Sequence, residues 1–181
     1  MQEEDLVING LYGVKKLHNF DDSVDREGRE EWQQDLRIKG ITVIPKHDDP
    51  IWRQYHYGDF KITSSNIGWQ PNKIETKSIN EKYYSRDKLI LFETMGQVEF
   101  NNPGSAFSEC RADIYAVAWW LDSRRKKLID HIFLHVLKTQ EWFKNNQHKY
   151  KEFKTQSTEG WTTLFKLVPL KDIPNEFSLD I

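Results

Sequence analysis

The chain has 181 residues, 38% of them hydrophobic and 13% aromatic, which predicts one folded domain and excludes a disordered chain. The net charge is −2 with 30% charged residues, and no stretch approaches the ~20 apolar residues that span a bilayer. The single cysteine, Cys110, excludes an intrachain disulfide and cysteine-based zinc spacing and favours a reducing, intracellular setting.

Charge is distributed unevenly along the chain. Residues 1–35 hold ten acidic and four basic side chains, whereas residues 124–154 hold nine basic and three acidic ones. The basic stretch could present one face to a polyanion, or both stretches could be ordinary solvated surface. The acidic N-terminus lacks an apolar core segment, so we expect no signal peptide and a cytoplasmic protein.

The first half of the chain predicts an irregular segment, a helix and three strands. Residues 1–26 are polar with scattered Gly and Asp, and a single domain is expected over residues 27–181. The helix is expected over 27–39, where Trp32 and Leu36 lie four residues apart. Alternating or β-branched residues predict the strands at 41–44, 55–63 and 73–79, with a turn over 64–72 between the last two.

The second half predicts further strands and one more helix. Residues 89–94 form a nearly continuous apolar run, which is typical of a buried strand, and residues 112–121 fit either a buried strand or a short helix. A strand over 131–137, a helix over 138–153 and a last strand over 162–168 follow. The order predicts an α/β (α+β) protein with a mixed central β-sheet flanked by helices.

Two neighbouring segments carry the residues that point to chemistry, Gly58-Asp59-Phe60-Lys61 and Glu75-Thr76-Lys77. On a strand, Glu75 and Lys77 face the same side, ~6.6 Å apart, and an antiparallel neighbour could bring Asp59 beside Glu75. Two adjacent carboxylates could bind a hard cation such as Mg²⁺, which lowers the pKa of a water and stabilises charge on a phosphate. Lys77 could then orient that water or neutralise the charge.

A plainer interpretation of the same pattern needs no chemistry. Asp59 would simply end a strand, and Glu75 and Lys77 would form an exposed ion pair of little energetic value.

The order of motifs around these residues resembles the PD-(D/E)XK nucleases of the restriction-endonuclease-like superfamily, in particular small phage and bacterial members. The likeness runs from about Tyr57 to Leu170. After the two segments above, it is carried by Phe92-Glu93-Thr94, Pro103-Gly104, Ala112-Asp113-Ile114-Tyr115, Leu137-Lys138 and Val168-Pro169.

The resemblance implies a restriction-endonuclease-like core and Mg²⁺-dependent hydrolysis of phosphodiester bonds, with Mn²⁺ as a substitute, in a bacterial or phage-infected cell. It implies that Asp59 and Glu75 are metal ligands and that Lys77 is the catalytic lysine. Many relatives add a glutamate from the helix before the first core strand, and Glu30 and Glu31 are the candidates here.

Two acidic residues inside apolar runs need an explanation, because burying a lone carboxylate costs several kcal/mol. Glu93 could support Lys77 or face solvent at a strand end. For Asp113 we expect a structural hydrogen-bonding role.

Other residues could contact a nucleic acid. Lys144, His148 and Lys151 have the spacing of one helix face, and Arg124, Arg125, Lys126 and Lys127 would extend it into a surface that follows phosphates or is merely solvated. Four aromatic residues flank the proposed site and could stack on unpaired bases or serve packing, namely Trp52, Tyr55, Tyr57 and Trp69.

The leading expectation is therefore a Mg²⁺-dependent nuclease, with DNA favoured over RNA, endonucleolytic cleavage favoured, and no membrane partner. Two alternatives stay open. One is a catalytically silent nucleic-acid- or protein-binding accessory protein on the same fold, such as a phage counter-defence protein. The other is a homodimeric junction-specific nuclease.

Overall fold

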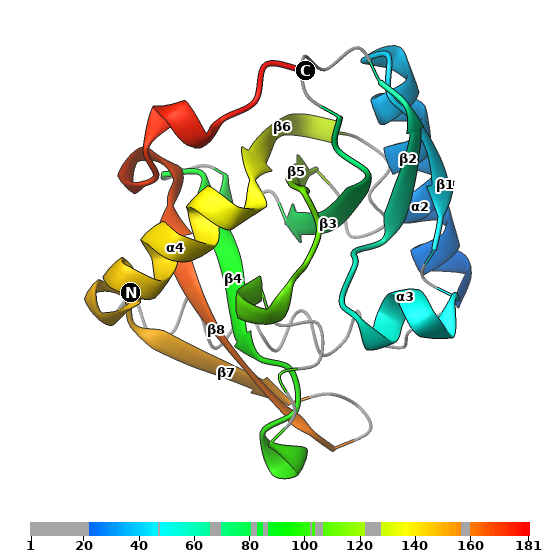
Figure 1. The fold of residues 1–181 in the computed structure, drawn as a ribbon. Coiled ribbons are helices and arrows are strands. Elements are labelled where there is room, and N and C mark those ends of the chain that lie inside the picture. The colour runs from blue at the N-terminus through cyan, green and yellow to red at the C-terminus, as the bar shows by residue number, and fades with distance from the viewer. Residues whose placement is uncertain are drawn as a thin grey trace.

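The fold is that of a computed structural model, shown in Figure 1. It describes residues 22–181 with gaps at 47, 66–69, 81–82, 85–86, 102, 104–106, 122–127 and 157–159, and it describes side chains from residue 30 onward, Asn80 excepted. Residues 1–21, Trp69 and the predicted basic residues Arg124, Arg125, Lys126 and Lys127 lie outside the described residues.

Helices and strands alternate irregularly along the chain. In order they are α2 (Asp22–Ile38), β1 (Thr42–Pro45), α3 (Pro50–Gln54), β2 (Phe60–Ser64), β3 (Lys73–Asn80), β4 (Leu89–Met95), β5 (Ile114–Trp120), β6 (Leu128–His135), α4 (Val136–Asn146), β7 (Glu152–Gln156) and β8 (Thr162–Pro169). Among the described helices, none is long and apolar enough to cross a lipid bilayer.

The strands form two sheets. One has five strands in the order β1-β2-β3-β5-β6, and the other has three in the order β4-β8-β7. In the larger sheet β3 and β5 are parallel, while the other neighbours are antiparallel. The prediction of a protein with helices around a mixed sheet is confirmed.

The five-stranded sheet is covered on both faces. On one face α2 contributes Trp32 and Leu36 to a core with Phe60, Ile74 and Ile114, and Figure 1 shows this helix beside β1 and β2. The indole Nε1 of Trp32 donates to Ser78 Oγ at 3.2 Å, which fixes the helix on β3.

The opposite face meets the smaller sheet and α4. Phe92 of β4 and Phe143 of α4 share a core with Tyr115 and Trp119 of β5. Tyr115 Oη donates to the carbonyl of Leu91 at 3.1 Å, which ties β5 to β4. Every residue of β5 is buried, so the apolar run 112–121 is a central strand and not a helix.

Several predicted boundaries were wrong. Residues 22–26, expected to be irregular, belong to α2, and the strand expected from residue 55 begins only at Phe60 because α3 precedes it. The side chain of Asp49 caps α3 by accepting from Ile51 N and Trp52 N, both at 3.1 Å, and Pro50 occupies the first turn.

The helix expected over 138–153 was too long. α4 ends at Asn146, a 3₁₀ turn spans Gln147–Lys149, and β7 follows. Phe153, expected on the helix, lies on β7 and stacks on Phe165 of β8 with 5.8 Å between ring centroids. The alternating exposure of β7 suits an edge strand better than a helix face.

Candidate active site

Gly58 allows the chain to approach β3 closely. Its φ is +94°, and a Cβ there would lie 2.5 Å from the carbonyl oxygen of Ile74, so a side chain would collide with the backbone of β3. The next residue, Asp59, donates its backbone N–H to the same carbonyl at 2.8 Å. The ladder continues with Phe60 opposite Ile74, so β2 and β3 pair antiparallel and Asp59 lies beside Glu75, as the sequence pattern anticipates.

The carboxylate of Asp59 is fixed by Thr76. Its Oδ2 accepts the backbone N–H of Thr76 at 2.8 Å and the hydroxyl of the same residue at 2.5 Å. Two donors to one carboxylate oxygen restrict its position. From sequence alone Thr76 is an ordinary β-branched strand residue, and nothing in the pattern predicts its contact with Asp59.

Glu75 faces away from α2, on the same side of β3 as Lys77 and Ile79. Burial raises its pKa well above the usual 4.5, and the negative charges of Asp59 and Glu93 raise it further, while Lys77 opposes them. A carboxyl group in this environment holds its proton to a higher pH than an exposed glutamic acid does.

Lys77 lies against Glu93 of β4. The distance from Nζ to Oε2 is 3.8 Å, and the two side chains keep 30% and 14% of their exposure, respectively. Glu93 is therefore not a solvated strand-end residue, and it lies beside Lys77 in the manner considered from the sequence. Gly96 gives it room, because a Cβ at that position would lie 3.2 Å from Glu93 Oε1.

Tyr115 of β5 lies opposite Glu75 on the adjacent parallel strand. Burial raises the pKa of Tyr115, and the Glu75 charge adds to that effect. Burial also raises the pKa of the Cys110 thiol, and the charge of Glu75 raises it further. This thiol is thus kept in its neutral form and lacks the character of a nucleophile.

The site as a whole combines three carboxylates and one ammonium, from the residue before β2, from β3 and from β4. Among the described residues, no group of three or more His, Cys, Asp or Glu side chains is placed to hold a metal ion. Mg²⁺ does not require such a group, because it keeps several waters and uses one or two protein carboxylates together with substrate phosphates. Asp59 and Glu75 fit that donor set, and a cation between them would relieve the repulsion that raises the pKa of Glu75.

The two helix glutamates named from the family likeness lie elsewhere. Glu30 is exposed and Glu31 is partly buried, and both belong to α2 on the opposite face of the sheet. Neither is among the charged groups that shift the pKa of Glu75.

Asp113 has the structural role expected of it. Its Oδ2 accepts from the backbone N–H groups of Asn72 at 2.6 Å and Lys73 at 3.0 Å. These bonds fix the start of β3 against the start of β5, and so they support the strand that carries Glu75.

Two lysines lie directly opposite each other at the same edge of the site. Lys61 of β2 pairs with Lys73 of β3, so both side chains share the face of Glu75. Like charges in directly opposed positions repel and destabilise a strand pair. Within the described part of the chain, neither lysine forms an ion pair with a carboxylate. Alternation along β2 and β3 predicts the face of each lysine, but the register that sets them opposite each other comes from the pairing of the two strands.

The predicted basic surface does not lie on one helix face. Lys144 is exposed on α4, but His148 is in the 3₁₀ turn and Lys151 follows it, so the regular spacing ends with the helix. The ammonium of Lys151 lies over the ring of Phe153, 5.6 Å from its centroid.

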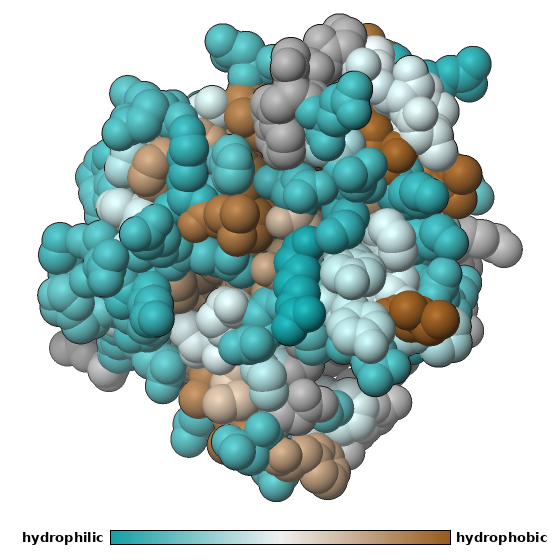
Figure 2. All heavy atoms as spheres, in the orientation of Figure 1, coloured by the Kyte–Doolittle hydropathy of each residue, from teal (hydrophilic) through white to brown (hydrophobic). Residues whose placement is uncertain are grey.

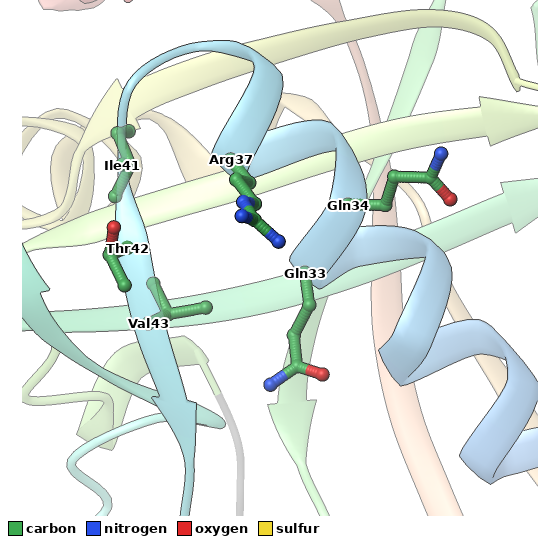
Figure 3. A pocket seen from close by; sticks show the side chains of 6 residues that line it. All are labelled: Gln33, Gln34, Arg37, Ile41, Thr42 and Val43. Atoms are coloured by element: carbon green, nitrogen blue, oxygen red, sulfur yellow. The ribbon is translucent and has the colours of Figure 1, made fainter.

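A shallow hollow of about 460 Å³ opens between α2 and β1, away from the carboxylates (Figure 3). Its lining residues are Gln33, Gln34, Arg37, Ile41, Thr42 and Val43. Arg37 is the charged member and no carboxylate takes part, so this hollow has no cation-binding chemistry.

No protein-family profile matches the chain, and no curated protein or solved structure is significantly similar to it.

Proposed function

We propose that the chain is a Mg²⁺-dependent nuclease of restriction-endonuclease-like type that hydrolyses phosphodiester bonds of DNA at Asp59, Glu75 and Lys77. The observation that carries the proposal is the fixed carboxylate of Asp59 beside Glu75, with Lys77 on the same face of β3. The resemblance of the sequence motifs to those of PD-(D/E)XK nucleases supports the same assignment.

Asp59 and Glu75 would hold the cation, which when bound lowers the pKa of a water and offsets negative charge on the phosphate. Thr76 keeps the Asp59 carboxylate in place before any ligand arrives. Such preorganisation avoids a reorganisation cost during the reaction.

Lys77 orients the attacking water or donates to a phosphate oxygen. Its ammonium is restrained by Glu93, so it approaches the reacting group from the β4 side of the site. A positioned donor of this kind is worth roughly 10²- to 10³-fold in rate.

The test compares the wild type with Glu75→Gln and Lys77→Met on single-stranded circular and supercoiled plasmid DNA, with Mg²⁺, Mn²⁺ or EDTA. Cleavage is expected only with metal, and both variants should lose at least 10²-fold in rate. Glu141→Gln and Lys138→Met change exposed residues of α4 and serve as charge-matched controls with wild-type rates. Circular dichroism verifies that each variant is folded.

Wild-type protein that binds DNA without cutting it under any metal condition would refute the nuclease. It would instead favour the catalytically silent accessory protein, and calorimetry should then detect no Mg²⁺ binding that depends on Glu75. Sedimentation with a four-way junction substrate tests the homodimeric alternative.

A further inference from the structure

Three aromatic side chains cluster on α3 and the turn that follows it. The rings of Tyr55 and Tyr57 are stacked, with 5.6 Å between centroids and 22° between planes. Trp52 meets Tyr57 edge-on at 5.4 Å. Tyr55 keeps 43% of its exposure, and Ile51 beside it keeps 65%. Figure 2 shows the region of α3 as a patch of pale, intermediate hydropathy with a strongly hydrophobic edge.

The cluster is held firmly beside the carboxylates. Tyr57 precedes Gly58 and Asp59 directly, and its backbone N–H donates to Trp52 O at 3.1 Å. The carbonyl of His56 accepts from Arg111 N at 2.7 Å, which anchors the turn to the segment before β5. These bonds fix the backbone of the turn that leads directly into Asp59.

Cations border the same rings. The ammonium of Lys73 lies 4.1 Å from the centroid of the Tyr57 ring, and Lys61 stands opposite Lys73 on the adjacent strand. Lys46 is near Trp52 as well, but it is engaged with Asp49 at 3.0 Å. The repulsion between Lys61 and Lys73 would be relieved by an anion on this face.

Packing alone explains Trp52 and Tyr57, which are partly buried against each other. It does not explain Tyr55, whose stacked ring lies at the surface beside exposed Ile51. Exposed aromatic rings beside basic side chains form the kind of surface on which successive bases stack while the backbone phosphates meet the cations.

We propose that this surface binds unpaired nucleotides next to the scissile phosphate, so that the substrate is single-stranded nucleic acid or a single-stranded end. One base stacks on Tyr55, and Lys61 and Lys73 contact the adjoining phosphates. A paired base would not be available for this contact, because its faces are covered by its neighbours in the duplex. The inference rests on the proposed function, because a scissile phosphate exists only if the chain is a nuclease. The binding test does not depend on cleavage.

The experiment measures fluorescence anisotropy of labelled single-stranded DNA, single-stranded RNA and blunt duplex DNA with the full chain in EDTA. Tyr55→Ala should weaken single-strand binding by about 5- to 100-fold. Tyr55→Phe keeps the ring and should bind like the wild type. Phe100→Ala removes another exposed ring, 70% exposed and remote in sequence, and should change nothing. The Tyr55 side chain is exposed, so the variant should keep the fold, which circular dichroism checks.

A salt titration tests the two lysines. Each phosphate contact to a single strand contributes about 0.7 to the slope of log K against log salt concentration. Lys61→Gln and Lys73→Gln should each reduce the slope by about that amount. Lys171→Gln removes an exposed lysine that pairs with Asp87 instead, and it should leave the slope unchanged.

Tyr55-dependent binding of either single strand supports the proposal, and the tighter of the two identifies the polymer. Tighter binding of the blunt duplex, or wild-type affinity in Tyr55→Ala, overturns it. The nuclease is judged separately by cleavage with Mg²⁺. Cleavage that does not depend on Tyr55 would refute this inference and leave the proposed nuclease intact. Tyr55-dependent binding without cleavage would refute the nuclease and leave the binding surface intact.

Discussion

Lys77 of β3 and Glu93 of β4 form an ion pair between the two sheets, with 3.8 Å between Nζ and Oε2. The pair makes β4 part of the site although it belongs to the other sheet. Through its charge, Glu93 also helps to raise the pKa of Glu75.

Glu93→Gln should therefore shift the pH dependence of cleavage. The variant removes one negative charge near Glu75, so the pKa of Glu75 falls and the acid limb of the rate profile moves to lower pH. The profile is measured from about pH 5 to 9 at a fixed Mg²⁺ concentration below saturation, so that protonation of Glu75 still limits the rate. Glu141→Gln controls for loss of a remote carboxylate, and an acid limb that stays in place would contradict the assigned coupling.

Glu75→Gln should stabilise the metal-free protein at neutral pH. The folded-state pKa of Glu75 is raised, so between its ordinary value of 4.5 and that raised pKa the folded chain binds more protons than the unfolded chain. The free energy of unfolding then declines as pH rises through this window. Above the window the fold carries the full cost of the ionised Glu75 carboxylate. Glutamine carries no charge and so avoids this cost. Each kcal/mol added to the free energy of unfolding raises Tm by roughly 2–4 °C.

Thermal melts in EDTA at several pH values check this expectation. The difference in Tm between Glu75→Gln and wild type should grow from pH 4.5 toward neutral pH. With Mg²⁺ the order should reverse, because the wild type alone gains the ligand's stabilisation. A variant that melts below the wild type in EDTA at pH 7 would count against a partly buried carboxylate that its neighbours repel.

Mg²⁺ binding should release a proton from Glu75. A cation and a proton compete for the same carboxylate, so affinity should rise with pH by up to about tenfold per unit while Glu75 is protonated. Calorimetry in buffers with different ionisation enthalpies measures the protons released. The number should approach one at the lower pH values and should vanish in Glu75→Gln, whereas pH-independent affinity would be inconsistent with Glu75 as a ligand.

Gly58→Ala should disturb both stability and cleavage. Its left-handed φ costs a side chain about 1–3 kcal/mol, and the new Cβ would also meet the Ile74 carbonyl at 2.5 Å, which pushes Asp59 away from β3. Gly160→Ala is the matched control, because its φ is +97° but nothing lies within 4 Å of the added Cβ. Urea melts should show a larger loss for Gly58→Ala, and equal losses would mean that close approach is unimportant.

Strand periodicity was sufficient to predict that Glu75 and Lys77 share a face, since that depends on two neighbouring residues. The place of Asp59 depended on an antiparallel pairing that local sequence only suggests. Glu93 could not be placed from sequence, because the contact of β4 with the site arises from packing between two sheets. The short helix α3 was missed because its stability comes from the Asp49 cap and Pro50, not from an apolar period.

The backbone ladder between β2 and β3 ends at Ile74, so the N–H of Thr76 meets the Asp59 carboxylate instead of another strand. Unpaired donors along a strand margin invite the addition of a foreign strand and hence aggregation. The Asp59 carboxylate therefore occupies a backbone donor that would otherwise be open to a foreign strand. Asp59→Asn keeps an acceptor for this N–H, but Asp59→Ala does not. The alanine variant should therefore aggregate sooner than the asparagine variant during storage, as followed by dynamic light scattering.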